Sequence, residues 1–232
     1  MEYKKTVDGI FLKRPNRFIA HVLINGEEEI VHVKNTGRCK ELLIPGAKVV
    51  LEDYSQNPNR KTRYSLIAVW KGEMLVNMDS QVPNEVVFEA LREGKINEIG
   101  DISYLKREVA FGSSRYDIYY ESKDKKAFME VKGVTLEDKG IAMFPDAPTE
   151  RGAKHVLEMM EAVKEGYEGT IFFLIQMKGP KELRPNWQMD ENFSEAVKLA
   201  SENGVRIIAY DSIVSENSII IDKPVKINLD KQ

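Results

Sequence analysis

Three residues suited to metal-dependent chemistry, Asp117, Glu130 and Lys132, lie in the middle of the chain. The segments around them, 115–121 and 126–132, are rich in β-branched and aromatic residues, which predicts two strands joined by a charged turn. Because side chains alternate along a strand, Glu130 and Lys132 share one face, and Asp117 joins them if the strands pair as a hairpin. Two carboxylates on one sheet face are costly unless a cation with oxygen ligands binds there.

An aspartate followed about a dozen residues later by Glu-x-Lys is the pattern of the PD-(D/E)xK nuclease superfamily. In such a site carboxylates hold Mg²⁺ or Mn²⁺, which polarises a phosphate and lowers the pKa of water, and a lysine stabilises the developing charge. The alternative is a cross-strand salt bridge on a solvated sheet face. Glu108, in the preceding predicted strand 104–111, is either a further metal ligand or a surface charge.

The predicted helix 148–164 carries basic groups that can reach a phosphate or a water molecule. Arg151 and His155 lie one turn apart on one stripe, with Lys154 beside them, while a second stripe of apolar residues faces the core. The alternative is a solvated helix face. Asp146 lies just before this helix, where we expect a helix cap rather than a metal ligand.

The first 80 residues contain five or six short predicted strands separated by turns rich in Asn, Pro and Gly. This spacing predicts a small barrel or a strongly twisted sheet. The segment Lys13-Arg14-Pro15-Asn16-Arg17-Phe18 interleaves basic and aromatic groups, which suits a nucleic-acid backbone. A turn at 35–38, ending in Arg38, has backbone amides that either cradle a phosphate or only reverse the chain.

From residue 84 onward the predicted order of elements is α-β-β-β-α-β-α-β. The helices are expected at 84–93, 148–164 and 193–203, and the strands at 104–111, 115–121, 126–132, 170–176 and 205–210, with a last short strand at 219–221 after this order. The nearly all-apolar strands at 170–176 and 205–210 indicate a sheet that is covered on both faces. The sequence therefore predicts a mixed sheet flanked by helices at 83–232, after a barrel at 1–82.

Composition limits the class of protein. Hydrophobic residues make up 42% of the 232 positions and charged residues 31%, an ordinary balance for a soluble globular protein. No apolar run approaches the roughly 18 residues of a membrane helix, no signal peptide is recognisable, and Cys39 alone cannot form an internal disulfide. We therefore expect a cytoplasmic protein that does not engage a membrane.

The charge distribution gives only local support for nucleic-acid binding. The formal net charge is -3, which argues mildly against a general attraction to phosphates. Residues 1–80, however, contain 13 Lys and Arg against 10 Asp and Glu, a net of +3. A phosphate-binding surface is therefore expected in the N-terminal part.

With these segments assembled, the chain resembles the sugar fermentation stimulation protein (SfsA) family nearly end to end. The long segments 129–136 and 144–155 carry most of the likeness, together with 17–20, 35–37, 45–46, 105–109 and 115–117. The resemblance implies an N-terminal OB-like barrel and a C-terminal α/β (α+β) domain of PD-(D/E)xK nuclease type. It also implies DNA binding linked to the regulation of sugar utilisation, and a DNA or RNA nuclease activity.

The resemblance also implies roles for individual residues. Asp117, Glu130 and Lys132 fall on the nuclease motif, and Glu108 takes the additional acidic position. Arg151 and His155 fall in the signature helix, which favours a functional role over a solvated face. The chain departs from the superfamily pattern only at Tyr116, where that pattern has proline.

We expect, on these grounds, a hydrolase that cleaves phosphodiester bonds in DNA or RNA with Mg²⁺ or Mn²⁺. The metal ligands would be Asp117, Glu130, Glu108 and the backbone carbonyl of Val131. Lys132, Arg151 and His155 would complete the catalytic group, and Lys13, Arg14, Arg17, Arg38 and Arg115 would contact the nucleic acid. Pairing into a homodimer would suit an enzyme that cuts both strands.

Two other classes of function stay open from the sequence. One is a non-catalytic DNA-binding regulator on a nuclease-like scaffold, against which the intact Asp117, Glu130 and Lys132 set argues. The other is a structural or protein-interaction module, which only the acidic C-terminal part supports.

Overall fold

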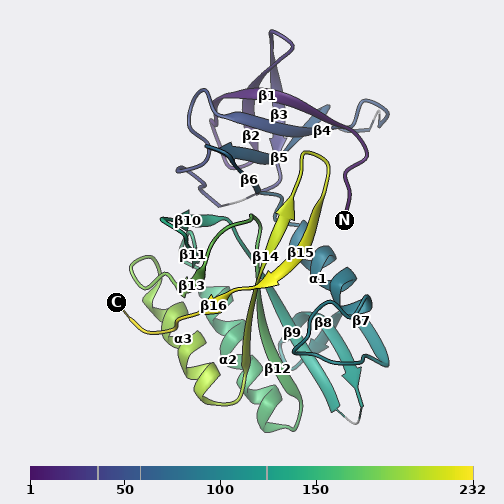
Figure 1. The fold of residues 1–232 in the computed structure, drawn as a ribbon, viewed down its shortest axis with the longest axis vertical. Coiled ribbons are helices and arrows are strands. Elements are labelled where there is room, and N and C mark those ends of the chain that lie inside the picture. Colours follow the sequence, from purple (N-terminus) through teal and green to yellow (C-terminus); the bar gives the residue numbers. More distant parts are fainter. Residues whose placement is uncertain (36, 58, 124, 232) are drawn as a thin grey trace.

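The computed structural model describes residues 1–35, 37–57, 59–123 and 125–231, and Figure 1 shows its two parts. Thr36 and Asp124, which fall in two of the predicted turns, lie outside this description. The N-terminal part contains β1 (Thr6–Lys13), β2 (Ile19–Ile24), β3 (Glu27–Val33), β4 (Lys48–Asp53), β5 (Tyr64–Lys71) and β6 (Met74–Asn77). Their order is β3-β2-β1-β4-β5-β6, and a pairing of β3 with β5 closes five of them into a barrel.

The barrel core follows from the alternation of side chains along its strands. In β2, Ala20, Val22 and Ile24 are buried, and the residues between them are only half-buried. Gly9 of β1 leaves room for close packing, since a Cβ there would lie 2.5 Å from Val22 Cγ1 and 3.0 Å from Leu51 Cδ1. The small barrel expected from the strand spacing is therefore confirmed.

The C-terminal part is built on a mixed six-stranded sheet. Its elements are α1 (Val82–Arg92), β7 (Tyr104–Phe111), β8 (Ser114–Ser122), β9 (Lys125–Val134), α2 (Glu150–Lys164), β12 (Glu168–Ile175), α3 (Glu191–Glu202), β14 (Arg206–Val214) and β15 (Ile219–Pro224). The strand order is β15-β14-β12-β9-β8-β7, in which β9, β12 and β14 are parallel. The predicted mixed sheet flanked by helices is confirmed, and the elements of this sheet and its helices follow one another in the predicted order.

Helices cover both faces of this sheet, as the apolar central strand predicts. In β12, Ile171 and Phe173 belong to the core beneath α2 and α3, whereas Phe172 and Leu174 belong to the core beneath α1. The helices bury apolar residues against it, among them Met159 of α2. Strands β9 and β12 therefore lie at the centre of the domain, and β9 carries the Glu-x-Lys pair.

A second, four-stranded sheet was not predicted. It consists of β10 (Leu136–Asp138), β11 (Ile141–Phe144), β13 (Glu182–Pro185) and β16 (Lys226–Ile227), in the order β10-β11-β13-β16. Its strands have at most four residues, too few to show a period, and β13 ends in a proline. The sequence prediction was incomplete here.

The cap of α2 also differs from the expectation. The helix begins at Glu150, and the N-cap is Thr149, whose side chain accepts a 3.1 Å hydrogen bond from the Gly152 backbone N–H. The capping role that we expected near Asp146 was therefore wrong. Asp146 instead faces the barrel, where its Oδ2 lies close to Gly37.

Buried polar contacts join the two parts. The Asn77 backbone N–H at the end of β6 donates to the Gln176 carbonyl (2.9 Å) just beyond β12. The Gln176 amide donates in return to Asn77 Oδ1 (2.9 Å) and to the Asp79 carbonyl (3.1 Å). No helix of the described residues is long and apolar enough to cross a membrane.

Candidate active site

The hairpin of β8 and β9 brings the two predicted carboxylates together. Ile118 pairs with Met129, so the next position along the ladder sets Asp117 opposite Glu130. Asp117 Oδ2 accepts a 2.8 Å hydrogen bond from the Val131 backbone N–H. Burial raises the pKa of Asp117 to about 6, and the negative charge of the neighbouring Glu130 adds to this rise.

Glu130 is buried with one oxygen fully engaged and the other without a partner. Its Oε1 accepts a 2.8 Å bond from Lys132 Nζ and lies 2.7 Å from His155 Nδ1. Its Oε2 is buried and has no hydrogen-bond partner. An unsatisfied buried carboxylate oxygen is costly, so a ligand at this oxygen would stabilise the site.

Helix α2 positions the basic groups on the other side of Glu130. Arg151 Nε lies 3.4 Å from His155 Nε2, one turn away, so Nε2 is the accepting nitrogen and Nδ1 carries the proton toward Glu130. The Tyr116 ring packs edge-on against the imidazole, with centroids 6.4 Å apart. Arg151, His155, Glu130 and Lys132 therefore form one connected group, of which the spacing on the helix predicted only the proximity of Arg151 and His155.

One residue of the site was missed from the sequence. Asn84, in the first turn of α1, donates a 2.7 Å hydrogen bond from Nδ2 to Asp117 Oδ1. Both oxygens of Asp117 are thus held, one by a backbone amide and one by a side chain. No sequence signal links Asn84 to a residue 33 positions away, because the packing of α1 on the sheet brings them together.

Glu108 and Arg115 are not brought to this group. The Glu108 side chain is 71% exposed and lies 3.5 Å from Arg115 Nη1, which belongs to a side chain that is 67% exposed. Position 108 faces position 117 along the ladder, because Arg107 pairs with Ile118 and Val109 with Tyr116. However, Glu108 has a φ of 52°, which is uncommon for a non-glycine residue and interrupts the alternation of the strand.

The carboxylate set is therefore smaller than predicted. Within the ranges that the structure describes, no three His, Cys, Asp or Glu side chains are grouped as metal ligands. Two carboxylates alone still suit Mg²⁺, which keeps several waters and is bound through one or two carboxylates plus substrate phosphates. The Val131 backbone lies at the site, since its N–H binds Asp117.

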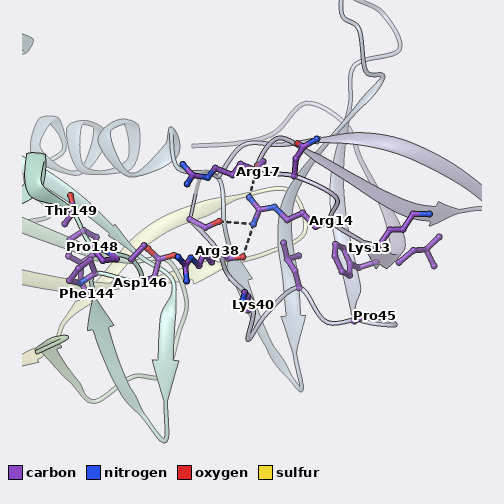
Figure 2. Close-up of a pocket in the computed structure, with 17 residues that line it drawn as sticks. Lys13, Arg14, Arg17, Arg38, Lys40, Pro45, Phe144, Asp146, Pro148 and Thr149 are labelled. Atoms are coloured by element: carbon purple, nitrogen blue, oxygen red, sulfur yellow. Dashed lines mark hydrogen bonds between the residues drawn. The ribbon is translucent and has the colours of Figure 1, made fainter. Parts of the chain in front are cut away.

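A cavity of about 850 Å³ lies between the barrel and the segment that precedes α2 (Figure 2). We call it the cationic cleft, because basic residues of the barrel line one wall: Lys13, Arg14, Arg17, Arg38 and Lys40. Segment 144–149 forms the other wall. Four of the five predicted nucleic-acid contacts, all except Arg115, therefore share one cavity.

Two models of one protein family match this chain, one in each of its two parts. The family model "SfsA N-terminal OB domain" matches residues 12–78, and "Sugar fermentation stimulation protein RE domain" matches residues 81–218. The chain belongs to the SfsA family. This confirms the predicted family and the OB nature of the barrel, and an OB domain in this family suggests DNA binding.

Relatives and a solved structure match over nearly the whole SfsA chain. The sugar fermentation stimulation protein homolog of Alkaliphilus oremlandii is 63% identical, over 98% of this chain and 99% of that protein. A homolog from Clostridium botulinum strain Langeland is 52% identical, over 97% and 98%. The structure of Pyrococcus furiosus SfsA in complex with Ca²⁺ has a TM-score of 0.88 and 28% identity, with 98% of both chains covered.

Proposed function

We propose that this SfsA protein is a nuclease that hydrolyses phosphodiester bonds in DNA or RNA with the help of Mg²⁺ or Mn²⁺. The observation that carries the proposal is the buried, unpartnered Oε2 of Glu130 opposite Asp117. Two acids that repel each other and leave an oxygen unsatisfied are expected where a cation belongs. A cation there would both offset the repulsion between the two carboxylates and give Glu130 Oε2 a partner.

The donor atoms fit a hard divalent cation. Asp117 and Glu130 would supply carboxylate oxygens, and the Val131 carbonyl remains a proposed third ligand. The P. furiosus relative was solved with Ca²⁺, an ion that also takes oxygen ligands, which supports a cation at this kind of fold. When bound, such an ion polarises the phosphate and lowers the pKa of water.

The other residues of the group would orient the reactants. The Lys132 side chain is only 14% exposed and its Nζ lies 2.8 Å from Glu130, so its positive charge is held beside the carboxylates. There it would orient a water molecule or stabilise the negative charge that develops on the phosphate. His155 would hold Glu130 through Nδ1, while Arg151, an exposed residue in the first turn of α2, would approach a phosphate.

Glu108 would join the metal site only after a change of its backbone. It already lies opposite Asp117 along the β7–β8 ladder, and its present partner Arg115 is an exposed residue. An exposed ion pair contributes about 0–1 kcal/mol, so losing it is a small cost against binding a cation. Glu108 therefore stays a proposed additional ligand.

The test is cleavage of end-labelled single- and double-stranded DNA and RNA by parent and Lys132→Ala protein, in Mg²⁺, Mn²⁺ or EDTA. We expect metal-dependent products from the parent and a loss of on the order of 100-fold or more with Lys132→Ala. Lys126→Ala is the matched control, because Lys126 lies on the same strand but is exposed. No cleavage by the parent, or equal rates for all three proteins, would contradict the proposal.

The second candidate is a DNA-binding regulator that does not cleave. One observation favours it: the cationic cleft is formed by the barrel and segment 144–149, without any of the carboxylates of the active site. Nucleic-acid binding can therefore occur without them. Salt-dependent binding of DNA with no product in Mg²⁺ or Mn²⁺ would support this candidate over the nuclease.

A further inference from the structure

The cationic cleft has the size of a site for a few nucleotides. Its volume of about 850 Å³ falls within the range of small-ligand sites, roughly 300–1,000 Å³. Barrel residues and segment 144–149 stand on opposite sides of it in Figure 2. A single strand can enter such a cavity with its bases unpaired, whereas a duplex would have to lie across its mouth.

Arg14 has a structural role in the cleft, because its guanidinium is already hydrogen-bonded within the protein. Its guanidinium donates hydrogen bonds to four backbone carbonyls, those of Gly37 (2.8 Å), Arg38 (2.9 Å), Arg17 (2.7 Å) and Asn35 (2.6 Å). Two of these carbonyls belong to the residues that present the neighbouring guanidinium groups. Arg14 thereby fixes the backbone from which Arg17 and Arg38 extend.

Three of the four other cations of the cleft are available to phosphates, whereas Lys13 is paired with Glu28. Arg17, Arg38 and Lys40 are exposed, and no carboxylate in the described part of the chain forms an ion pair with them. The one carboxylate on the opposite wall is Asp146. Burial raises the pKa of Asp146, and the positive charges of Arg14 and Arg38 oppose that rise.

Phe18 is an exposed aromatic residue that comes next in sequence after the cleft lining. Phe18 follows the lining residue Arg17, and its side chain is 55% exposed. The Asn16 side chain holds the turn, because Oδ1 accepts from the backbone N–H groups of Phe18 (2.9 Å) and Ile19 (3.0 Å). An exposed ring on a fixed turn beside free cations is the arrangement on which unpaired bases stack.

One wall of the cleft adjoins the helix that carries Arg151 and His155. Its lining ends at Pro148 and Thr149, directly before α2. His155 lies six residues beyond Thr149, which is about 9 Å along a helix. A strand that leaves the cleft along this helix therefore arrives beside Arg151 and the carboxylates.

We propose that the cationic cleft holds a single-stranded segment of nucleic acid, with phosphates on Arg17, Arg38 and Lys40 and a base stacked on Phe18, and delivers it along α2 to Glu130. This inference rests on the proposed function and narrows its substrate to single strands or to single-stranded ends. It assigns specific contacts to the cleft, and these can be measured without catalysis.

The experiment measures fluorescence anisotropy of a labelled single-stranded DNA and of the same sequence as a duplex, in EDTA and over a series of salt concentrations. We expect the parent to bind the single strand more tightly than the duplex. With Arg38→Ala/Lys40→Ala, the slope of log affinity against log salt should become less steep by about 1.4, from roughly 0.7 for each lost phosphate contact. Lys106→Ala/Lys126→Ala, which removes two exposed charges from β7 and β9, should leave the slope unchanged.

A second variant tests the stacking. Phe18→Ala should weaken single-strand binding by roughly 5- to 150-fold and leave duplex binding unchanged. Tyr104→Ala, which removes a 48% exposed ring from β7, is its control. Equal affinity of the parent for single strand and duplex, or equal effects of the cleft variants and their controls, would overturn the inference. Because EDTA prevents cleavage in every arm, these results are independent of whether the protein is a nuclease.

Discussion

Asn84 Nδ2 donates a 2.7 Å hydrogen bond to Asp117 Oδ1, so the first helix of the C-terminal part holds one of the two carboxylates at the centre of the site. The other oxygen of Asp117 is held by the Val131 N–H. Partners of this kind set the orientation of a metal-ligating carboxylate. Asn84 is therefore a positioning residue for the proposed chemistry.

Replacing Asn84 with alanine should weaken the binding of Mn²⁺ and lower kcat by about 10- to 100-fold, because Asp117 loses one of its two donors. KM for a nucleic-acid substrate should change little, since Asn84 does not line the cationic cleft. Calorimetry and steady-state cleavage assays would measure the two effects. Glu85→Ala, which removes an exposed ion pair with Arg107 from the same helix, should alter neither. A change in KM alone would exclude the positioning role.

Glu130→Gln should abolish the binding of Mn²⁺ in isothermal titration calorimetry, because the amide lacks the negative charge and offers only one acceptor oxygen. The parent should bind the ion with a measurable heat. Glu121→Gln, on the neighbouring strand β8, should behave like the parent. Retained binding by Glu130→Gln would place the cation elsewhere.

The metal-free protein should become less stable as pH rises through about 6. The pKa of Asp117 in the folded protein is raised to about 6, above the ordinary value near 3.9, so its protonated form favours folding. This contribution is complete below about pH 4 and is lost as pH rises through 6. In EDTA, Asp117→Asn should therefore be more stable than the parent at pH 8, by about 2 kcal/mol, and similar at pH 4.

The amide that Asp117→Asn introduces can keep the hydrogen bonds with Asn84 and with the Val131 N–H, if the side-chain amide of Asn84 flips so that its oxygen accepts. Urea unfolding at the two pH values would measure the difference in stability between variant and parent. Added Mn²⁺ should reverse the order at pH 8, since it stabilises only the parent. An equal advantage of the variant at both pH values would point to a cause other than ionisation.

Asp53 in the barrel should have the opposite pH dependence. Its side chain is 1% exposed and contacts Arg63, Lys5 and the Ser55 backbone N–H. The hydrogen bond from the Arg63 guanidinium contributes most to lowering the pKa of Asp53. This stabilisation is present above about pH 4 and is lost as pH falls further. Asp53→Asn should cost roughly 2 kcal/mol at pH 7 and progressively less toward pH 2. Asp101→Asn, at an exposed position, should change urea unfolding little at either pH.

The sequence predicts those parts of the site that depend on local periodicity. The hairpin of β8 and β9 follows from period-two alternation, and the link between Arg151 and His155 follows from one helical turn. The contacts of Asn84 and Gln176 depend on how helices and strands that are far apart in the sequence pack together. No local sequence pattern contains this information. The strands β10, β11, β13 and β16 are too short to show a period.

Glu108 shows a different limit of sequence reasoning. Its position in the ladder, opposite Asp117, is the one that an acidic ligand requires. Whether its side chain reaches the site depends on a single backbone dihedral, and a φ of 52° leaves the carboxylate at the surface. Alternation rules assume regular strands, so they do not detect such a residue.

Gln176 has a consequence for how a bound strand would be cut. It ties β6, the last strand of the N-terminal part, to the centre of the six-stranded sheet through a pair of hydrogen bonds with Asn77. The barrel therefore cannot swing freely relative to the carboxylates. In the proposed nuclease, the protein would therefore fix the number of nucleotides between the position held in the cleft and the scissile bond. Its products should then carry a constant offset from the held end.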